Sequence, residues 1–131
     1  MISNINNYIS DLDELKTIIT NNPGLILINF KAKWCNPCNT VSPLINNYLY
    51  NNFNKDNVKI YIIDIDESIE LYIKLKKLKI LSGIPSLICY KNKVNDFNNI
   101  SFFFPDDSTF GSNQNNIIEF FNRCEKFIYN L

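Results

Sequence analysis

The sequence predicts an α/β protein in which helices cover both faces of a central mixed sheet of four to five strands. The apolar run Leu25–Phe30, in which Asn29 is the one polar residue, is typical of a central strand that is buried on both faces, and a second apolar run, Val58–Ile65, predicts a parallel strand. Stretches with apolar residues at helical spacing precede, separate and follow these runs, which is the alternation expected of a three-layer α/β/α architecture. We expect one domain over residues 1–131, because this length is ample for a single hydrophobic core.

The N-terminal part is expected to form a short strand within Ile2–Ile9 and then a helix that reaches about Asn21. Ser10 and Asp11 are both suitable N-caps, and an acidic residue lies three positions after each of them, as in a capping box. The turn Asn22-Pro23-Gly24 ends this helix before the first apolar run.

A second helix is expected to begin within Cys35–Cys38 and to run to about Tyr50. Pro37 lies in its first turn, where the missing N–H costs nothing because first-turn donors have no helical partner. Pro43 lies inside the helix and is expected to kink it. Its buried stripe is expected to comprise Val41, Leu44, Ile45, Tyr48 and Leu49.

The second half of the chain predicts a third helix over Glu67–Leu78 and a strand over Leu87–Tyr90. A tight turn near Asn92 and a further strand over Ile100–Phe104 predict an antiparallel hairpin at one side of the sheet. A loop over 105–112 then leads to a last helix. The core positions expected on the third helix are Ile69, Tyr72, Ile73, Leu75 and Leu78, and those on the last are Ile117, Ile118, Phe120, Phe121, Cys124, Phe127 and Ile128.

The composition excludes several classes of function. The formal net charge is zero, with 13 basic and 13 acidic side chains, so no nucleic-acid partner is expected. The absence of histidine excludes Ser-His-Asp and Cys-His catalysis and histidine metal sites. Neither a signal peptide nor an apolar run of membrane-spanning length is recognisable, so we expect a cytoplasmic protein with no membrane partner. In that reducing compartment four cysteines are expected to be thiols rather than a disulfide framework.

The feature that carries chemistry is Cys35-Asn36-Pro37-Cys38, at a junction from strand to helix. Two thiols at this spacing beside a strand–helix–strand pattern are typical of a redox dithiol. Cys35 just before a helix N-terminus would have a lowered pKa, and the thiolate is the attacking species in disulfide exchange. Cys38, about one turn later, is placed to resolve the mixed disulfide.

Three features together resemble the thioredoxin family over residues 25–91. The segment Phe30-Lys31-Ala32-Lys33-Trp34-Cys35-Asn36-Pro37-Cys38 is similar to the family motif F-x-A-x-W-C-G-P-C. Pro43 lies five residues after Cys38, where thioredoxins have a helix-kinking proline. Gly83-Ile84-Pro85-Ser86-Leu87 is similar to G-I/V-P-T-L, whose proline is cis in the family.

The resemblance implies a thioredoxin fold and a thiol–disulfide oxidoreductase that reduces protein disulfides. Trp34 would shield one side of the site, and Ile84 and Pro85 would bind an extended substrate beside the sulfurs. The expected partners are disulfide-containing proteins and an electron donor, either a reductase like thioredoxin reductase or a small thiol. No cofactor is expected beyond the Cys35–Cys38 disulfide, and we expect a monomer that acts in electron transport and thiol homeostasis.

The sequence departs from the family pattern at three places. Asn29 stands where many thioredoxins have a buried Asp, and Ile62 stands where a lysine often accompanies it, so both members of a buried charged pair are absent. Asn36 replaces a glycine between the cysteines and is expected to tune the reduction potential, as Pro37 does. Residues 94–116 lack a Val-Gly-Ala-type substrate loop, and their phenylalanines are expected either in the core or on a docking surface.

Other interpretations remain open from the sequence alone. Cys35 and Cys38 could be half of a zinc site, although no histidine and no second Cys-x-x-Cys are present. Pro85 could be an ordinary trans proline. Cys89 and Cys124 are expected to be small buried residues, or else a regulatory disulfide. The chain could also be a disulfide oxidase or isomerase, or a binding or structural protein of the same fold with a slow or vestigial dithiol.

Overall fold

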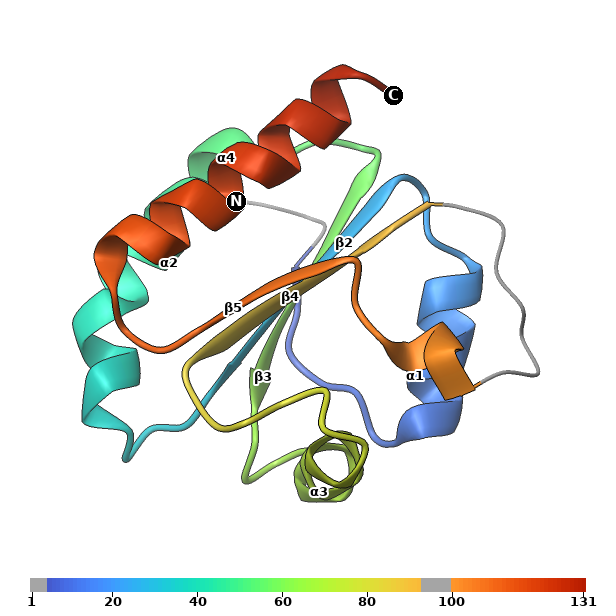
Figure 1. Ribbon diagram of the computed structural model, residues 1–131, viewed down its shortest axis with the longest axis vertical. Coiled ribbons are helices and arrows are strands. Elements are labelled where there is room, and N and C mark those ends of the chain that lie inside the picture. Colours follow the sequence, from blue (N-terminus) through green and yellow to red (C-terminus); the bar gives the residue numbers. More distant parts are fainter. Residues whose placement is uncertain (1–4, 93–99) are drawn as a thin grey trace.

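The structure, a computed structural model, describes residues 5–92 and 100–131, and their elements alternate between strands and helices (Figure 1). The strands lie edge to edge in one twisted sheet, with helices on both sides of it. The elements are β1 (Ile5–Asn6), α1 (Leu12–Thr20), β2 (Leu25–Lys31), α2 (Asn36–Asn52), β3 (Val58–Asp64), α3 (Ile69–Lys77), β4 (Ser86–Lys91), a 3-10 turn (Ile100–Phe103), β5 (Asp107–Phe110) and α4 (Gln114–Tyr129).

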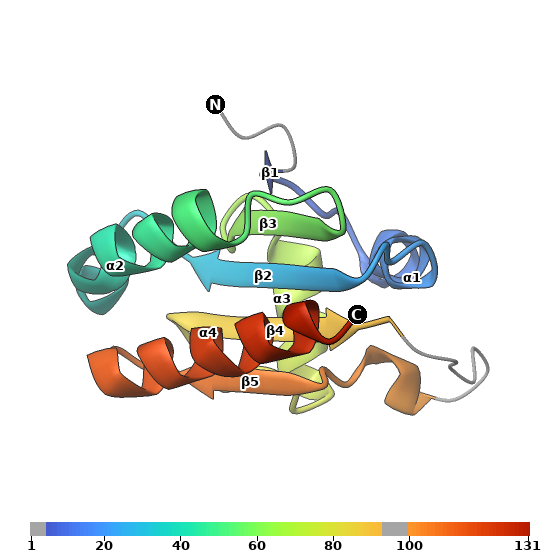
Figure 2. The same cartoon turned by 90° about the horizontal axis from the view of Figure 1, so that it is seen from above.

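The described strands form a five-stranded mixed sheet in the order β1-β3-β2-β4-β5, with β2 at its centre. β1 and β2 both pair parallel with β3, whereas β4 pairs antiparallel with β2 and with β5. Seen from above, β2 and β5 therefore end, and β4 begins, at the same end of the sheet (Figure 2). This confirms the predicted mixed sheet and the central position of the apolar run in β2.

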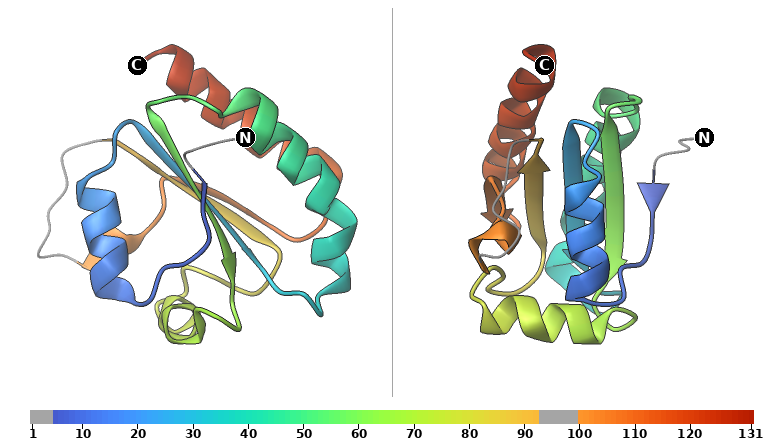
Figure 3. Two further views of the ribbon diagram at one scale, coloured as in Figure 1. Left: turned by 180° about the vertical axis from the view of Figure 1, so that it is seen from behind. Right: turned by 90° about the vertical axis from the view of Figure 1, so that its right-hand side faces the viewer.

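Each face of the sheet has its own hydrophobic core because side chains alternate along a strand. Ile26 and Ile28 of β2 point to the face that α1 and α3 cover, and Leu25 and Leu27 point to the face that α2 and α4 cover (Figure 3). A strand buried on both faces needs apolar residues at successive positions, which explains the continuous run in β2. None of the described helices is long and apolar enough to cross a membrane.

The helix ends follow the capping signals in the sequence. At α1 the Asp11 carboxylate accepts a hydrogen bond of 2.9 Å from the Glu14 backbone N–H, and Glu14 reaches back to the Ser10 N–H at 3.1 Å. Both predicted caps, Ser10 and Asp11, therefore form a hydrogen bond with the same residue, Glu14. The helix α2 begins directly after Cys35 and continues through Pro43, with Val41, Ile45 and Leu49 buried as expected and Leu44 and Tyr48 partly buried.

The buried face of α3 confirms the prediction at Leu75 and in part at Tyr72, but differs from it elsewhere. Ile69 and Ile73, expected in the core, are exposed, and the fully buried residues are Leu71 and Leu75. Ile69 and Ile73 are four residues apart, and so are Leu71 and Leu75, so the sequence allows either pair to face inward. The sheet selects Leu71 and Leu75, which pack on the core shared with α1.

The predicted hairpin after β4 is wrong in its details. The segment expected as a strand over Ile100–Phe104 is a 3-10 turn over Ile100–Phe103, and the strand that pairs with β4 is Asp107–Phe110, inside the expected loop. The tight turn at Asn92 is likewise wrong, because the connection between the two strands extends from 92 to 106. Residues 93–99 of it lie outside the described part, as do residues 2–4 of the strand expected within Ile2–Ile9, of which Ile5–Asn6 is seen.

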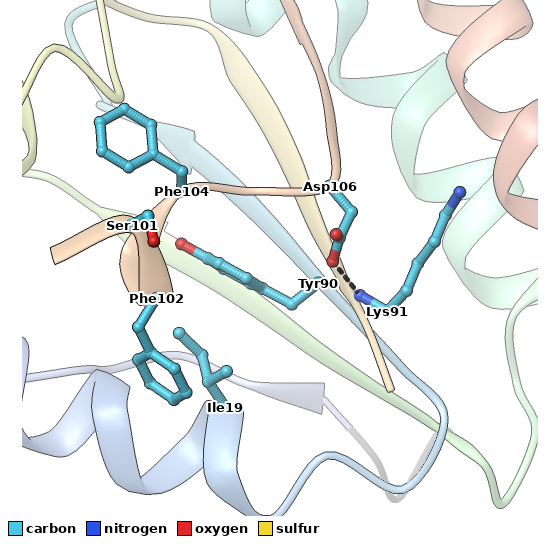
Figure 4. Close-up of a pocket in the computed structure, with 7 residues that line it drawn as sticks. All are labelled: Ile19, Tyr90, Lys91, Ser101, Phe102, Phe104 and Asp106. Carbon is cyan, nitrogen blue, oxygen red and sulfur yellow. Dashed lines mark hydrogen bonds between the residues drawn. The ribbon is translucent and has the colours of Figure 1, made fainter. Parts of the chain in front are cut away.

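Two successive residues of β4, Tyr90 and Lys91, hold the 3-10 turn and the segment that follows it (Figure 4). The Tyr90 hydroxyl donates a 2.7 Å hydrogen bond to the Phe103 carbonyl, and the Lys91 N–H donates one of 2.7 Å to the Asp106 carboxylate. A cavity of about 20 Å³ remains between these groups and Ile19. Of the four phenylalanines in question, Phe102 is buried and Phe103 partly buried, whereas Phe104 and Phe110 are exposed. The core interpretation is therefore correct for only two of them.

Candidate active site

The two cysteines of the motif lie at the junction between β2 and α2, and a disulfide joins them in this structure. Their Cα atoms are 5.2 Å apart. The backbone N–H of Cys35 donates to the Ala32 carbonyl at 3.2 Å, which turns the chain tightly after β2. Both cysteine side chains are buried, while the two intervening residues, Asn36 and Pro37, are exposed.

Cys35 is the N-cap of α2, and its Sγ accepts a hydrogen bond of 3.2 Å from the Cys38 backbone N–H. The first backbone donors of a helix lack helical partners, and the helix dipole adds about half a positive charge at this end. When the disulfide is reduced, both effects favour a negative charge on the Cys35 sulfur. Cys38 lies inside the first turn and is not at the cap.

The loop with the predicted cis-proline lies at the same end of the sheet. The Ile84–Pro85 peptide bond is cis, which confirms the expectation from the resemblance. Ser86, which follows it, pairs with Phe30 of β2, and Ile84 packs on the core cluster that contains Cys35 and Cys38. The Ser86 hydroxyl donates to the Gly83 carbonyl at 2.7 Å and holds the loop closed.

Trp34 projects into solvent beside the disulfide, with 64% of its surface exposed. Its indole Nε1 donates a 2.8 Å hydrogen bond to the Asp66 carboxylate, and the Asp66 N–H in turn donates to the Asp64 carboxylate at 2.9 Å. Asp66 did not figure in the sequence analysis. Its position just after β3 was a usable signal, because the carboxyl ends of parallel strands meet at one edge.

Asn29 lies beneath this end of the sheet, buried and directly across from Ile62. Neither residue of this cross-strand pair can titrate. A surface hollow of about 260 Å³ lies beside Ile62, and four charged side chains also line it: Lys31, Lys33, Asp64 and Glu67.

The end of the loop expected over 105–112 lies beside Pro85, a contact that the sequence did not predict. The Gly111 N–H donates a 2.9 Å hydrogen bond to the Pro85 carbonyl, so the corner between β5 and α4 is tied to the cis-proline loop. Gly111 has φ of +100°, a conformation that side chains disfavour. The glycine just before a predicted helix was the signal for this corner, although its neighbours do not spell Val-Gly-Ala.

The other two cysteines, Cys89 on β4 and Cys124 on α4, are free and buried in the core cluster beneath α2 and α4. A hydrogen bond with Cys89 raises the pKa of the Cys124 thiol, and burial raises it further. These thiols match the expectation of small buried residues. Within residues 5–92 and 100–131, no three side chains of the metal-ligating types His, Cys, Asp and Glu gather into a group.

Comparisons with known proteins agree with this geometry. The family model described as Thioredoxin matches residues 8–101. Thioredoxin from Coprinus comatus is 29% identical over 84 residues, which cover 64% of this chain and 74% of that protein, and thioredoxin from Chlamydia pneumoniae is 35% identical over 69 residues, 53% and 61% respectively. The solved structure of Trichomonas vaginalis thioredoxin superimposes with a TM-score of 0.66 at 22% identity, covering 92% of this chain and 96% of that one. The chain therefore belongs to the thioredoxin family of thiol–disulfide oxidoreductases.

Proposed function

We propose that this oxidoreductase reduces disulfide bonds in other proteins, with Cys35 as the attacking thiol and Cys38 as the resolving thiol. The observation that carries the assignment is the hydrogen bond from the Cys38 N–H to the Cys35 Sγ at the N-terminus of α2. A positioned donor and the helix dipole stabilise a thiolate at Cys35 and not at Cys38.

In the proposed reaction the Cys35 thiolate attacks one sulfur of the substrate disulfide and releases the other as a thiolate. Cys38 then loses its proton and attacks Cys35, which releases the second substrate thiol and leaves the Cys35–Cys38 disulfide. Two electrons pass to the substrate. The disulfide in the structure corresponds to this oxidised product state.

The surrounding residues are proposed to bind the substrate and to tune the dithiol. Trp34, fixed by Asp66, forms one wall, and the backbone of Ile84 and Pro85 pairs with an extended substrate segment. Pro37 and Asn36 set the geometry of the first turn, and Asn29 makes proton transfer depend on solvent instead of a buried carboxylate. That Asn29 cannot titrate supports the last point.

The oligomeric state, the compartment and the electron donor are also part of the proposal. All 131 residues would act as one monomeric domain in the cytoplasm, and a reductase like thioredoxin reductase, or a small thiol, would return the disulfide to the dithiol. The disulfide itself would be the redox group, with no further cofactor. The buried free thiols Cys89 and Cys124 suit a reducing compartment.

The test is insulin reduction driven by dithiothreitol, together with trapping of a mixed disulfide. Wild type should accelerate the reduction, and both Cys35→Ser and Cys38→Ser should abolish the acceleration. Cys38→Ser should accumulate a mixed disulfide with insulin, because nothing resolves it, whereas Cys35→Ser should not. An inactive wild type would overturn the function, and trapping by Cys35→Ser instead would reverse the roles of the two cysteines.

A further inference from the structure

The surface hollow beside Ile62 lies outside the carboxyl ends of three parallel strands. Asn7 follows β1, Lys31 ends β2 and Asp64 ends β3, and all three residues line the hollow. The helix after β2 covers one face of the sheet, and the helix after β3 covers the other. Open α/β sheets bind ligands at such a position, because the chain leaves neighbouring strands in opposite directions and opens a crevice there.

Four charged side chains, two of each sign, line the hollow. Lys31 and Asp64 lie directly across from each other at the ends of β2 and β3, and Lys33 and Glu67 lie in the loops that follow. Although Lys31 and Asp64 are neighbours, none of the four side chains takes part in an ion pair within residues 5–92 and 100–131. Their ammonium and carboxylate groups are therefore available to a ligand.

The balance of charge in the hollow determines which kind of ligand fits. A simple anion such as phosphate is attracted by the two lysines but repelled by the two carboxylates, and a simple cation meets the reverse. A molecule that carries both an ammonium and a carboxylate can pair with all four groups. The hollow, at about 260 Å³, is smaller than the about 300–1,000 Å³ of pockets for drug-sized ligands, so the ligand is a small one.

We propose that the hollow binds a small zwitterion, which is an amino acid or a short peptide with free ends. Its ammonium contacts Asp64 and Glu67, and its carboxylate contacts Lys31 and Lys33. Lys31 and Asp64 are half-buried, which strengthens their contacts because less water screens them. The site lies on the side of β2 that faces β3 and β1, whereas the cis-proline loop precedes β4 on the other side. It is therefore separate from the place proposed for the substrate disulfide.

Trp34 provides a signal for binding in this hollow. Lys33 directly precedes Trp34, and Glu67 directly follows Asp66, whose carboxylate accepts the hydrogen bond from the indole. A ligand that contacts both Lys33 and Glu67 therefore changes the surroundings of the indole. Because Trp34 is the single tryptophan, its fluorescence follows binding without a label.

The experiment titrates the oxidised full chain with glycylglycine at pH 7, where most of this peptide carries both charges, and records calorimetry and Trp34 fluorescence. Three probes serve for comparison. N-acetylglycylglycine lacks the ammonium, glycylglycinamide lacks the carboxylate, and inorganic phosphate tests for a simple anion site. Glycylglycine should bind about tenfold more tightly than each of the three, the factor that one hydrogen bond between charged groups supports.

Lys31→Gln and Asp64→Asn each remove one charge from the hollow and should weaken the binding of glycylglycine about tenfold. Lys59→Gln is the matched control and should bind like wild type, because Lys59 is an exposed lysine near the start of β3, at the opposite end of that strand.

Four results would each overturn the inference. They are no binding of millimolar glycylglycine to wild type, equal affinity for glycylglycine and the two peptides that lack one charge, tighter binding of phosphate than of glycylglycine, and unchanged affinity in folded Lys31→Gln and Asp64→Asn. None of these measurements depends on disulfide reduction, so a failure of the proposed function would leave the inference intact.

Discussion

Asn29 on β2 lies directly across from Ile62 on β3, and within the described part of the chain the Asn29 Oδ1 accepts no hydrogen bond. Asn29→Asp would place a carboxylate here without donors or a counter-charge, and burial would raise its pKa. We expect unfolding free energy at pH 7 to fall by about 1–3 kcal/mol. A raised carboxyl pKa costs stability as pH rises, so the loss should shrink toward pH 4.

The same substitution should give disulfide exchange a new pH dependence between pH 6 and 9, because a titratable group then lies beneath the dithiol. Adding Ile62→Lys supplies the missing counter-charge and should recover part of the stability, which a double-mutant cycle measures. Two results would contradict the view that this cross-strand pair replaces a charged one. The first is that the losses of stability in the two single variants simply add in the double variant. The second is that Asn29→Asp leaves the exchange rates unchanged across this pH range.

The hydrogen bond between Trp34 and Asp66 is predicted to position the indole for substrate binding. Asp66→Ala should lower kcat/KM for insulin several-fold and leave 2-hydroxyethyl disulfide unaffected, because only a large substrate contacts the indole. Trp34 is the single tryptophan, so a change in fluorescence reports the lost bond directly. Asp66→Asn keeps an acceptor oxygen, so its kcat/KM for insulin should lie between those of wild type and Asp66→Ala. An equal loss for both substrates would instead point to a role at the sulfurs.

Stability should fall at alkaline pH because Cys124 and Tyr90 are buried in their neutral forms. A hydrogen bond with Cys89 and burial raise the pKa of Cys124, and burial, followed by the charge of Asp106, raises that of Tyr90. When the pKa of such a group is raised in the folded state, stability is unaffected below the pKa of the unfolded chain, which is about 8.5 for Cys and 10 for Tyr. Above that pKa the free energy of unfolding falls by up to about 1.4 kcal/mol per pH unit for each group.

Urea denaturation between pH 7 and 10.5 measures this loss. Cys124→Ala should remove the part that begins near pH 8.5, and Tyr90→Phe the part near pH 10. Tyr90→Phe also loses the bond to the Phe103 carbonyl and should be about 1 kcal/mol less stable at pH 7. If Cys124→Ala keeps the wild-type slope between pH 8.5 and 10, Cys124 is not the group that titrates.

Acid should weaken the attachment of β5 to α4. Burial raises the pKa of Asp107, but hydrogen bonds from Arg123 and from the Ser108 N–H outweigh it, and the net pKa is lowered. A lowered pKa gives stability that is present above the unfolded value, about 3.9, and is lost as pH falls through the folded value. Asp107→Asn should cost about 0.5–1 kcal/mol at pH 7, since Arg123 is half exposed, and should flatten the decline below pH 4.

The central strand, the start of α2 and the dithiol were predictable from the sequence, because each depends on local chemistry. Five apolar residues among the six positions 25–30 leave β2 no exposed face, and Cys35 followed by Pro37 determines where a helix can begin. The cis-proline was predictable only through resemblance. The same local logic explains the capping of α1 by Asp11, which involves a contact across three residues.

The buried face of α3, the position of β5 and the surroundings of the disulfide depend on packing between segments that are distant in the sequence. Ile69 and Leu71 are equally apolar, and only packing on the sheet distinguishes them. Three of the four residues of β5 are polar and the strand lies at the edge of the sheet, so its local signal is weaker than that of Ile100–Phe104. The latter segment contains a 3-10 turn whose Phe103 carbonyl accepts a hydrogen bond from the Tyr90 hydroxyl. The contacts Trp34–Asp66 and Gly111–Pro85 join residues 32 and 26 positions apart. No local pattern specifies such pairs, because they exist only once the strand ends meet at one edge of the sheet.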